Sequence, residues 1–152
     1  AVFTARMVEF DLTKAGYGVT GSKIIVADST RIAFKGALTF GGTVDSIAYY
    51  LGSPDTSTKN PNDFWLTRHA RSRGPLQLRL GLTQLQISYY DSLNSQMKTP
   101  VTGTNLLAIR GINVKLRIES QEPITDPMTG VTGYFAVNWE KLIFPRNLGK
   151  PF

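Results

Sequence analysis

The stretch GINVKLRIES, residues 111–120, carries the strongest strand signal of the chain. Apolar and polar side chains alternate along it, with Ile112, Val114, Leu116 and Ile118 on one side and Asn113, Lys115, Arg117 and Glu119 on the other. A period of two is typical of a strand with one face in the core and the other in water. Antiparallel sheets commonly have one such dry face, so the stretch predicts a strand of an antiparallel sheet.

Working outward, further short alternating or apolar runs predict strands at 23–27, 31–35, 44–51, 64–70, 76–80, 85–91 and 134–144. Polar stretches without periodicity separate them and predict loops at 52–63, 91–105 and 121–133. Residues 17–152 are therefore expected to be rich in β-structure.

Residues 1–15 differ from the rest, because their apolar residues follow a helical period. Phe3, Met7 and Phe10 recur at this period, and Val8, Leu12 and Ala15 follow it beside them. Together they form one broad apolar stripe, which is expected to be buried against the sheet. Gly16 is placed to end the helix. The sequence thus predicts an α+β fold with one domain over 1–152, in which an N-terminal helix at 1–16 packs on antiparallel β-sheet.

Composition excludes several classes of protein. The chain has 152 residues, of which 41% are hydrophobic, so it is not a disordered chain. It has no cysteine, which excludes disulfides, cysteine metal sites and thiol nucleophiles. Seventeen Lys and Arg against eleven Asp and Glu give a charge of +6, which is only weak evidence for an anionic partner.

The chemistry-bearing residues do not form a catalytic pattern. His69 is the only histidine, and it has cationic neighbours on and after the predicted strand 64–70 and no catalytic partners near it in the sequence. No phosphate-binding glycine motif is present either. Because neither a catalytic pattern nor a cofactor motif is found in the sequence, we predict a protein that is not an enzyme and holds no cofactor. Asp91, Asn94 and Asp126 lie in loops and could offer oxygen ligands to calcium, although such residues also form turns.

A basic cluster leaves two interpretations open. Arg68, Arg71 and Arg73 lie close in sequence to Trp65 and His69. Arginines interleaved with an aromatic residue could hold single-stranded nucleic acid by charge and stacking. The alternative is a solvated strand face whose charges protect a sheet edge.

The order of several segments resembles a known family. These segments are DLTKAGYG (11–18), IAYYL (47–51), LTRHA (66–70), LTQLQISYYDS (82–92), INVKLRIES (112–120) and FPRN (144–147). They are similar to type IV pilin-like proteins, and more closely to PilW-type minor pilins and J-type minor pseudopilins of type II secretion. The family's N-terminal signature is not among the residues given. The resemblance therefore implies that residue 1 lies well inside a longer helix, which also explains why no capping residue precedes Phe3.

The resemblance implies a pilin-like fold and a structural role in a type IV pilus or a secretion pseudopilus. Such a subunit would lie near the filament tip and prime assembly by contacting other minor subunits and the major subunit. Its precursor would be anchored in the inner membrane through the missing part of the helix, with a periplasmic domain. The expected contact residues are Arg6, Glu9 and Lys14 on the helix, together with the loops 52–63 and 91–105.

Two other functions remain open from the sequence. One is a DNA-binding minor pilin used in uptake, or another nucleic-acid-binding β domain, which the net charge and the basic cluster favour. The other is a carbohydrate-binding or phage-tail-type β domain, in which the first fifteen residues form an incidental helix.

Overall fold

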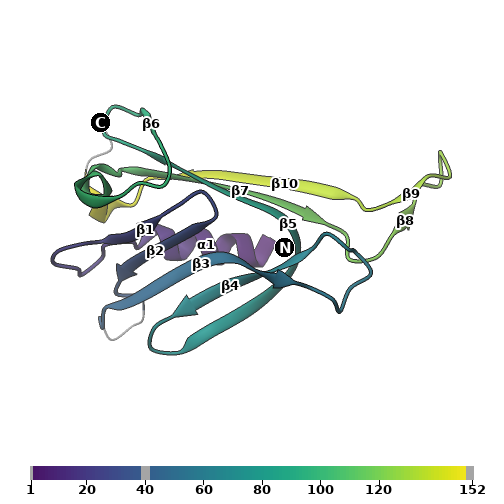
Figure 1. The fold of residues 1–152 in the computed structure, drawn as a ribbon, viewed down its shortest axis with the longest axis horizontal. Coiled ribbons are helices and arrows are strands. Elements are labelled where there is room, and N and C mark those ends of the chain that lie inside the picture. The colour runs from purple at the N-terminus through teal and green to yellow at the C-terminus, as the bar shows by residue number, and fades with distance from the viewer. Residues whose placement is uncertain (1, 39–41, 150–152) are drawn as a thin grey trace.

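One antiparallel sheet, curled into a half-barrel, organises the computed structural model, which describes residues 2–38 and 42–149 (Figure 1). The elements are α1 (Val2–Thr13), β1 (Ile24–Ala27), β2 (Arg31–Gly36), β3 (Asp45–Pro54), β4 (Phe64–Ala70), β5 (Gly74–Tyr90), β6 (Gln96–Met97), η1 (Gly103–Ala108), β7 (Gly111–Glu119), β8 (Ile124–Thr125), β9 (Thr132–Gly133), β10 (Ala136–Ile143) and η2 (Arg146–Leu148). The strand order is β1-β2-β3-β4-β5-β7-β10, and β6 also pairs with β5. Strands β8 and β9 form a separate small ribbon.

The long strand β5 produces the curl, because it changes partner along its length. Its first half pairs with β4 as far as Leu82, and its second half pairs with β7 from Leu82 onward. The sequence predicted two strands here, at 76–80 and 85–91, and this separation is wrong. Gly81 interrupts the alternation without ending the strand. Gly81 has a positive φ of 74°, and the carbonyl of Glu119 occupies the place where a Cβ would lie. Only glycine can therefore hold this backbone without strain.

The expectation of an α+β, pilin-like fold is wrong. Over the described residues the chain is mainly β, with a single α-helix of 12 residues and one large sheet that curls upon itself. The sequence-based expectation failed because strand periodicity reports that one face is buried, but not how far a sheet bends. Here the buried residues of the strands and of the helix belong to one common core.

Helix α1 lies inside the curl, beside β10 (Figure 1). Ala5, Val8, Leu12 and Ala15 are at most 3% exposed and belong to the common core. Val8 and Leu12 line the same small internal space as Leu66 and Val114. Burial of an apolar face of this kind is the main source of stability for a helix too short to persist alone.

The stripe of larger side chains on the helix does not behave as predicted. Phe10 is 53% exposed and Met7 is only half-buried. The side chain of Phe3 lies outside the described residues. Among the described residues, no helix has the length and apolarity needed to cross a membrane.

Candidate functional site

A buried polar cluster joins the helix to the sheet. The carboxylate of Asp11 accepts a 2.6 Å hydrogen bond from the hydroxyl of Tyr49 on β3. The same oxygen, Oδ2, accepts a 2.7 Å charge-assisted bond from Nε of Arg68 on β4. Asp11 is 3% exposed, so this contact lies in the interior. We call these three residues the helix latch.

The electrostatics of the helix latch favour one arrangement of protons and charges. Burial raises the pKa of Tyr49, and the neighbouring charge of Asp11 raises it further, so the phenol stays a donor. Burial opposes the charge of Arg68, but the hydrogen bond and the charge of Asp11 outweigh it and raise the pKa of the guanidinium. The cluster holds its partners in place and presents no free nucleophile.

A second contact fixes the turn that follows the helix. Gly16 has a positive φ of 83°, and a Cβ placed there would lie 3.1 Å from the carbonyl oxygen of Asn147. Lys23 donates a hydrogen bond from its ammonium to that same carbonyl. The end of α1 and the C-terminal segment are therefore held together near the start of the sheet.

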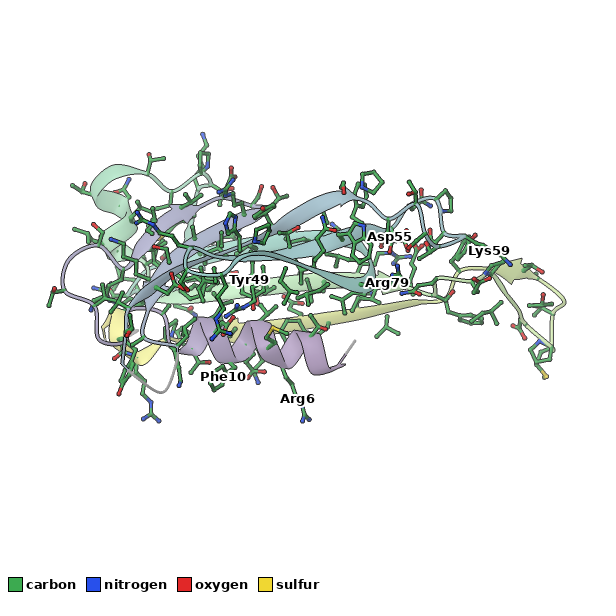
Figure 2. All side chains as sticks on the ribbon, turned by 90° about the horizontal axis from the view of Figure 1, so that it is seen from below. Arg6, Phe10, Tyr49, Asp55, Lys59 and Arg79 are labelled. Carbon is green, nitrogen blue, oxygen red and sulfur yellow. The ribbon has the colours of Figure 1, made fainter. Side chains whose placement is uncertain are left out.

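The helix residues predicted to contact partners lie in three different environments. Arg6 is exposed and points away from the sheet, as does the neighbouring Phe10 (Figure 2). Lys14 places its ammonium 4.6 Å from the centre of the Phe10 ring. Glu9 forms a 3.5 Å ion pair with Lys141 on β10, so it also ties the helix to the sheet edge.

The predicted basic cluster is divided by the pleat of β4. Arg68 points inward, to the helix latch. Arg71 and Arg73 are exposed in the turn that follows the strand. Trp65 and His69 alternate with Arg68 along β4 and therefore lie on the outer face of the sheet.

The three candidate calcium residues do not come together. Asp91 lies in the turn between β5 and β6, where it accepts hydrogen bonds from the N–H groups of Leu93 (2.9 Å) and Ser95 (3.0 Å). Asn94 is in the same turn, with a φ of 58°. Asp126 lies in the segment between β8 and β9, at the opposite end of the molecule (Figure 1), and accepts a 2.8 Å bond from its own turn. Each aspartate therefore stabilises the turn in which it lies by accepting hydrogen bonds from backbone N–H groups.

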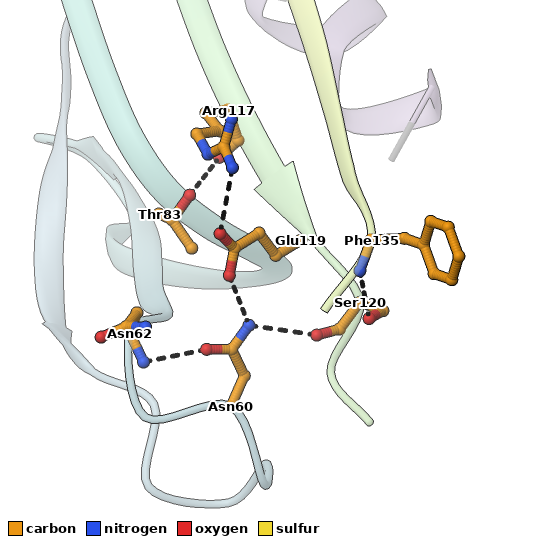
Figure 3. Close-up of polar contacts among 7 residues, drawn as sticks. All are labelled: Asn60, Asn62, Thr83, Arg117, Glu119, Ser120 and Phe135. Atoms are coloured by element: carbon orange, nitrogen blue, oxygen red, sulfur yellow. Dashed lines mark hydrogen bonds and ion pairs between the residues drawn. The ribbon is translucent and has the colours of Figure 1, made fainter. Parts of the chain in front are cut away.

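The loop after β3 is more buried than its polar sequence suggested. Asn60 is 2% exposed and donates to Glu119 (2.9 Å) and to the carbonyl of Ser120 (3.1 Å) at the end of β7 (Figure 3). Asp55 is paired with Arg79 at 3.3 Å. Through Asn60, this loop, which lies within the predicted contact segment 52–63, connects the end of β3 to the end of β7.

An exposed apolar arm extends beyond the sheet at this end (Figure 1). It consists of the ribbon β8–β9 and the residues that connect it to β7 and β10, and its largest exposed side chains are Ile124, Met128, Val131 and Phe135. Met128 is 91% exposed. A shallow hollow of about 370 Å³ lies among Ile124, Val131 and Phe135. The sequence predicted a loop at 121–133, which has no sustained periodicity, and placed Phe135 in the following strand.

The helix latch could have been found from sequence. Asp11 lies three residues after Val8 and four before Ala15, which places a carboxylate on the apolar side of the helix. Buried carboxylates are almost always paired, so this position required a cation or strong donors from the sheet. Arg68 lies between Leu66 and Ala70 in the strand alternation, a signal for the inner face that the prediction of a basic cluster did not use.

In comparisons with protein-family models, curated proteins and solved structures, nothing matches the chain. Functional inference therefore rests on the residues of this chain.

Proposed function

We propose that this chain is a non-enzymatic structural subunit of a type IV pilus or a type II secretion pseudopilus, and that it works by contacting neighbouring subunits. One observation carries the proposal: the segments on which the family resemblance rests touch one another in space. Asp11 of DLTKAGYG bonds Tyr49 of IAYYL and Arg68 of LTRHA. These contacts bring three of the segments into one cluster, which supports a shared structural role for them.

The remaining segments support the same proposal. Gly16, from the first segment, packs against Asn147 of FPRN. Residues 82–92 and 112–120 contribute the paired parts of β5 and β7. The similarity therefore corresponds to a set of contacts that hold the helix inside the curl.

The exposed side of α1 is the surface we assign to subunit contacts. Its inner side is occupied by the core and the helix latch, whereas Arg6 and Phe10 face away from the sheet and Thr13 is exposed. Phe10 is an aromatic side chain that is half exposed, with Lys14 over its ring. Aromatic residues are enriched in protein interfaces. The apolar arm is a second surface available to a partner.

Site-specific crosslinking in the native host tests this function. A photo-crosslinking amino acid at Phe10, in the full-length gene, should join the chain to other filament subunits in sheared filaments or in membrane extracts. The control is the same amino acid at Gln86, an exposed position on the outer face of β5. The expected result is a crosslink from Phe10 that is absent or much weaker from Gln86.

Gene deletion gives the second half of the test. Loss of the gene should reduce the number of surface filaments or the secretion of type II substrates. Normal filaments and normal secretion after deletion, together with no crosslink from Phe10 to a filament subunit, would refute the proposal.

A further inference from the structure

The outer face of β2, β3 and β4 carries an unneutralised positive strip. Register places Arg31 beside Tyr50, Ala33 beside Ala48, and Ala48 beside His69. The residues that alternate with these, such as Ile32 and Tyr49, are 1% exposed and face the core. The cations and rings of this strip therefore point away from the helix.

We define the basic strip as Arg31, Lys35, Tyr50, Trp65, His69, Arg71 and Arg79. A shallow hollow of about 260 Å³ lies at its middle, with Ala33 and Ala48 at its floor and Arg31, His69 and Arg71 around it. From Trp65 to His69 the strip follows β4 for four residue steps, which is about 13 Å, and Arg71 continues it in the turn after the strand. It is long enough for several nucleotides of an extended strand.

The cations of the strip are not neutralised by the protein. Within the described part of the chain, Arg31, Lys35 and Arg71 make no ion pair. Arg79 is the exception, because it pairs with Asp55 at the far end of the strip (Figure 2).

The other half of the outer face provides the contrast. There Lys115 pairs with Glu140 at 3.7 Å, and Arg117 pairs with Glu119 at 3.4 Å. The same sheet thus balances its charges over β7 and β10 and leaves them unbalanced over β2 to β4. A general need for solubility does not explain a difference between two halves of one face.

The planar groups on the strip indicate which anion fits. The guanidinium of Arg31 lies 5.1 Å from the centre of the Tyr50 ring, and that of Arg79 lies 5.0 Å from the Trp65 ring. Nucleic acid bases stack on aromatic rings and on guanidinium planes, while cations beside them track the phosphates. A sheet face that combines both groups suits unpaired bases, whose flat surfaces are accessible.

From this geometry we infer that the outer face of β2, β3 and β4 binds single-stranded nucleic acid through the basic strip. This inference is independent of the filament role, because it uses the sheet face opposite the helix. Arg71 and His69, which the sequence had grouped with Arg68, act here without it.

Fluorescence anisotropy with a labelled oligothymidylate tests the inference. The double variant Arg31→Ser/Arg71→Ser removes two unpaired cations from the strip. The control Lys115→Ser/Arg117→Ser removes the same charge from the paired half of the sheet. We expect at least a tenfold loss of affinity at about 50 mM salt for the first variant and less than about twofold for the control.

Salt dependence and tryptophan emission sharpen the test. Loss of two phosphate contacts should reduce the slope of log K against log salt by about 1.4. In a Trp139→Phe background the remaining Trp65 reports directly on the strip, and its emission should be quenched by the oligonucleotide. Circular dichroism and thermal melting establish that both variants remain folded.

Four outcomes would overturn the inference. The first is no binding of the oligonucleotide at low salt. The second is an equal loss in both double variants, which would indicate attraction by net charge alone. The third is duplex DNA, or a sulfated polysaccharide of the same charge, binding as tightly as the single strand. The fourth is unchanged Trp65 emission on binding.

Discussion

Asp11→Asn is the sharpest perturbation of the helix latch. The substitution keeps the size of the side chain but removes the charge that Tyr49 and Arg68 share. Both bonds end on the same oxygen, so the amide oxygen of asparagine in that place would be a neutral acceptor for both donors. The flipped amide would instead present its NH₂, itself a donor, to two donors.

The expected cost follows from the geometry of Asp11. A hydrogen bond to a charged group contributes about 1.5–3 kcal/mol, and removal of one partner of a fully buried ion pair costs about 3–5 kcal/mol. The side chain of Arg68 is 20% exposed and can gain some hydration after the change, which places the loss near the overlap of these ranges. We therefore expect the free energy of unfolding to fall by about 3 kcal/mol.

Urea denaturation followed by circular dichroism measures this loss. With an m value of about 2 kcal/mol/M, the midpoint should fall by about 1.5 M. The matched control is Glu9→Gln, which removes the ion pair to Lys141 on the same helix. Those side chains are 36% and 51% exposed, so the control should cost less than about 0.5 kcal/mol.

Hydrogen exchange locates the effect. Because the helix latch connects α1 to β3 and β4, the amides of α1 should exchange faster in Asp11→Asn, with a smaller change in β7. If Asp11→Asn costs no more than Glu9→Gln, apolar burial alone holds the helix and the reasoning about the latch is refuted.

Two further predictions concern the sheet and its loops. A hydrogen bond from Ser57 lowers the pKa of Asp55, so its ionised form stabilises the fold above the unfolded pKa of about 3.9 and is lost as pH falls through the folded value. Acid unfolding followed between about pH 4 and 2 should therefore lose more stability in the native chain than in Asp55→Asn, and parallel curves would contradict this. Gly81→Ala should cost more than about 3 kcal/mol, because it adds a clash with the carbonyl of Glu119 to a left-handed backbone. Gly130→Ala, with a φ of 72° and open space around it, should cost only about 1 kcal/mol, and equal thermal shifts for the two variants would rule out the clash.

Strand positions could be predicted from sequence where one face is dry and the other wet. Strand β7 is the clearest case, because Val114 and Leu116 are at most 2% exposed while Lys115, between them, faces water. Strands β1 and β2 were also predicted, at 23–27 and 31–35. Helix α1 was predicted from its period, but the burial of Phe10 was not correctly predicted.

The curl of the sheet could not be predicted, because it depends on where a strand changes partner. A broken alternation at Gly81 indicates a turn and a bulge equally well, and only the partner strands decide between them. The same limit applied to the loop at 55–63. Its burial arises from Asn60 reaching β7, a contact between residues far apart in the chain.

The sequence LTRHARSR (66–73) shows why the direction of each charge matters more than the total of +6. The pleat sends Arg68 inward to a carboxylate, where its charge is neutralised and holds the helix. Two residues of the same segment, His69 and Arg71, lie around the hollow on the outer face. Removing Arg68 should therefore lower stability with little effect on an anionic ligand, whereas removing Arg71 should do the reverse. The effect on stability and the effect on ligand binding should separate in this way because the strand has one buried and one exposed face.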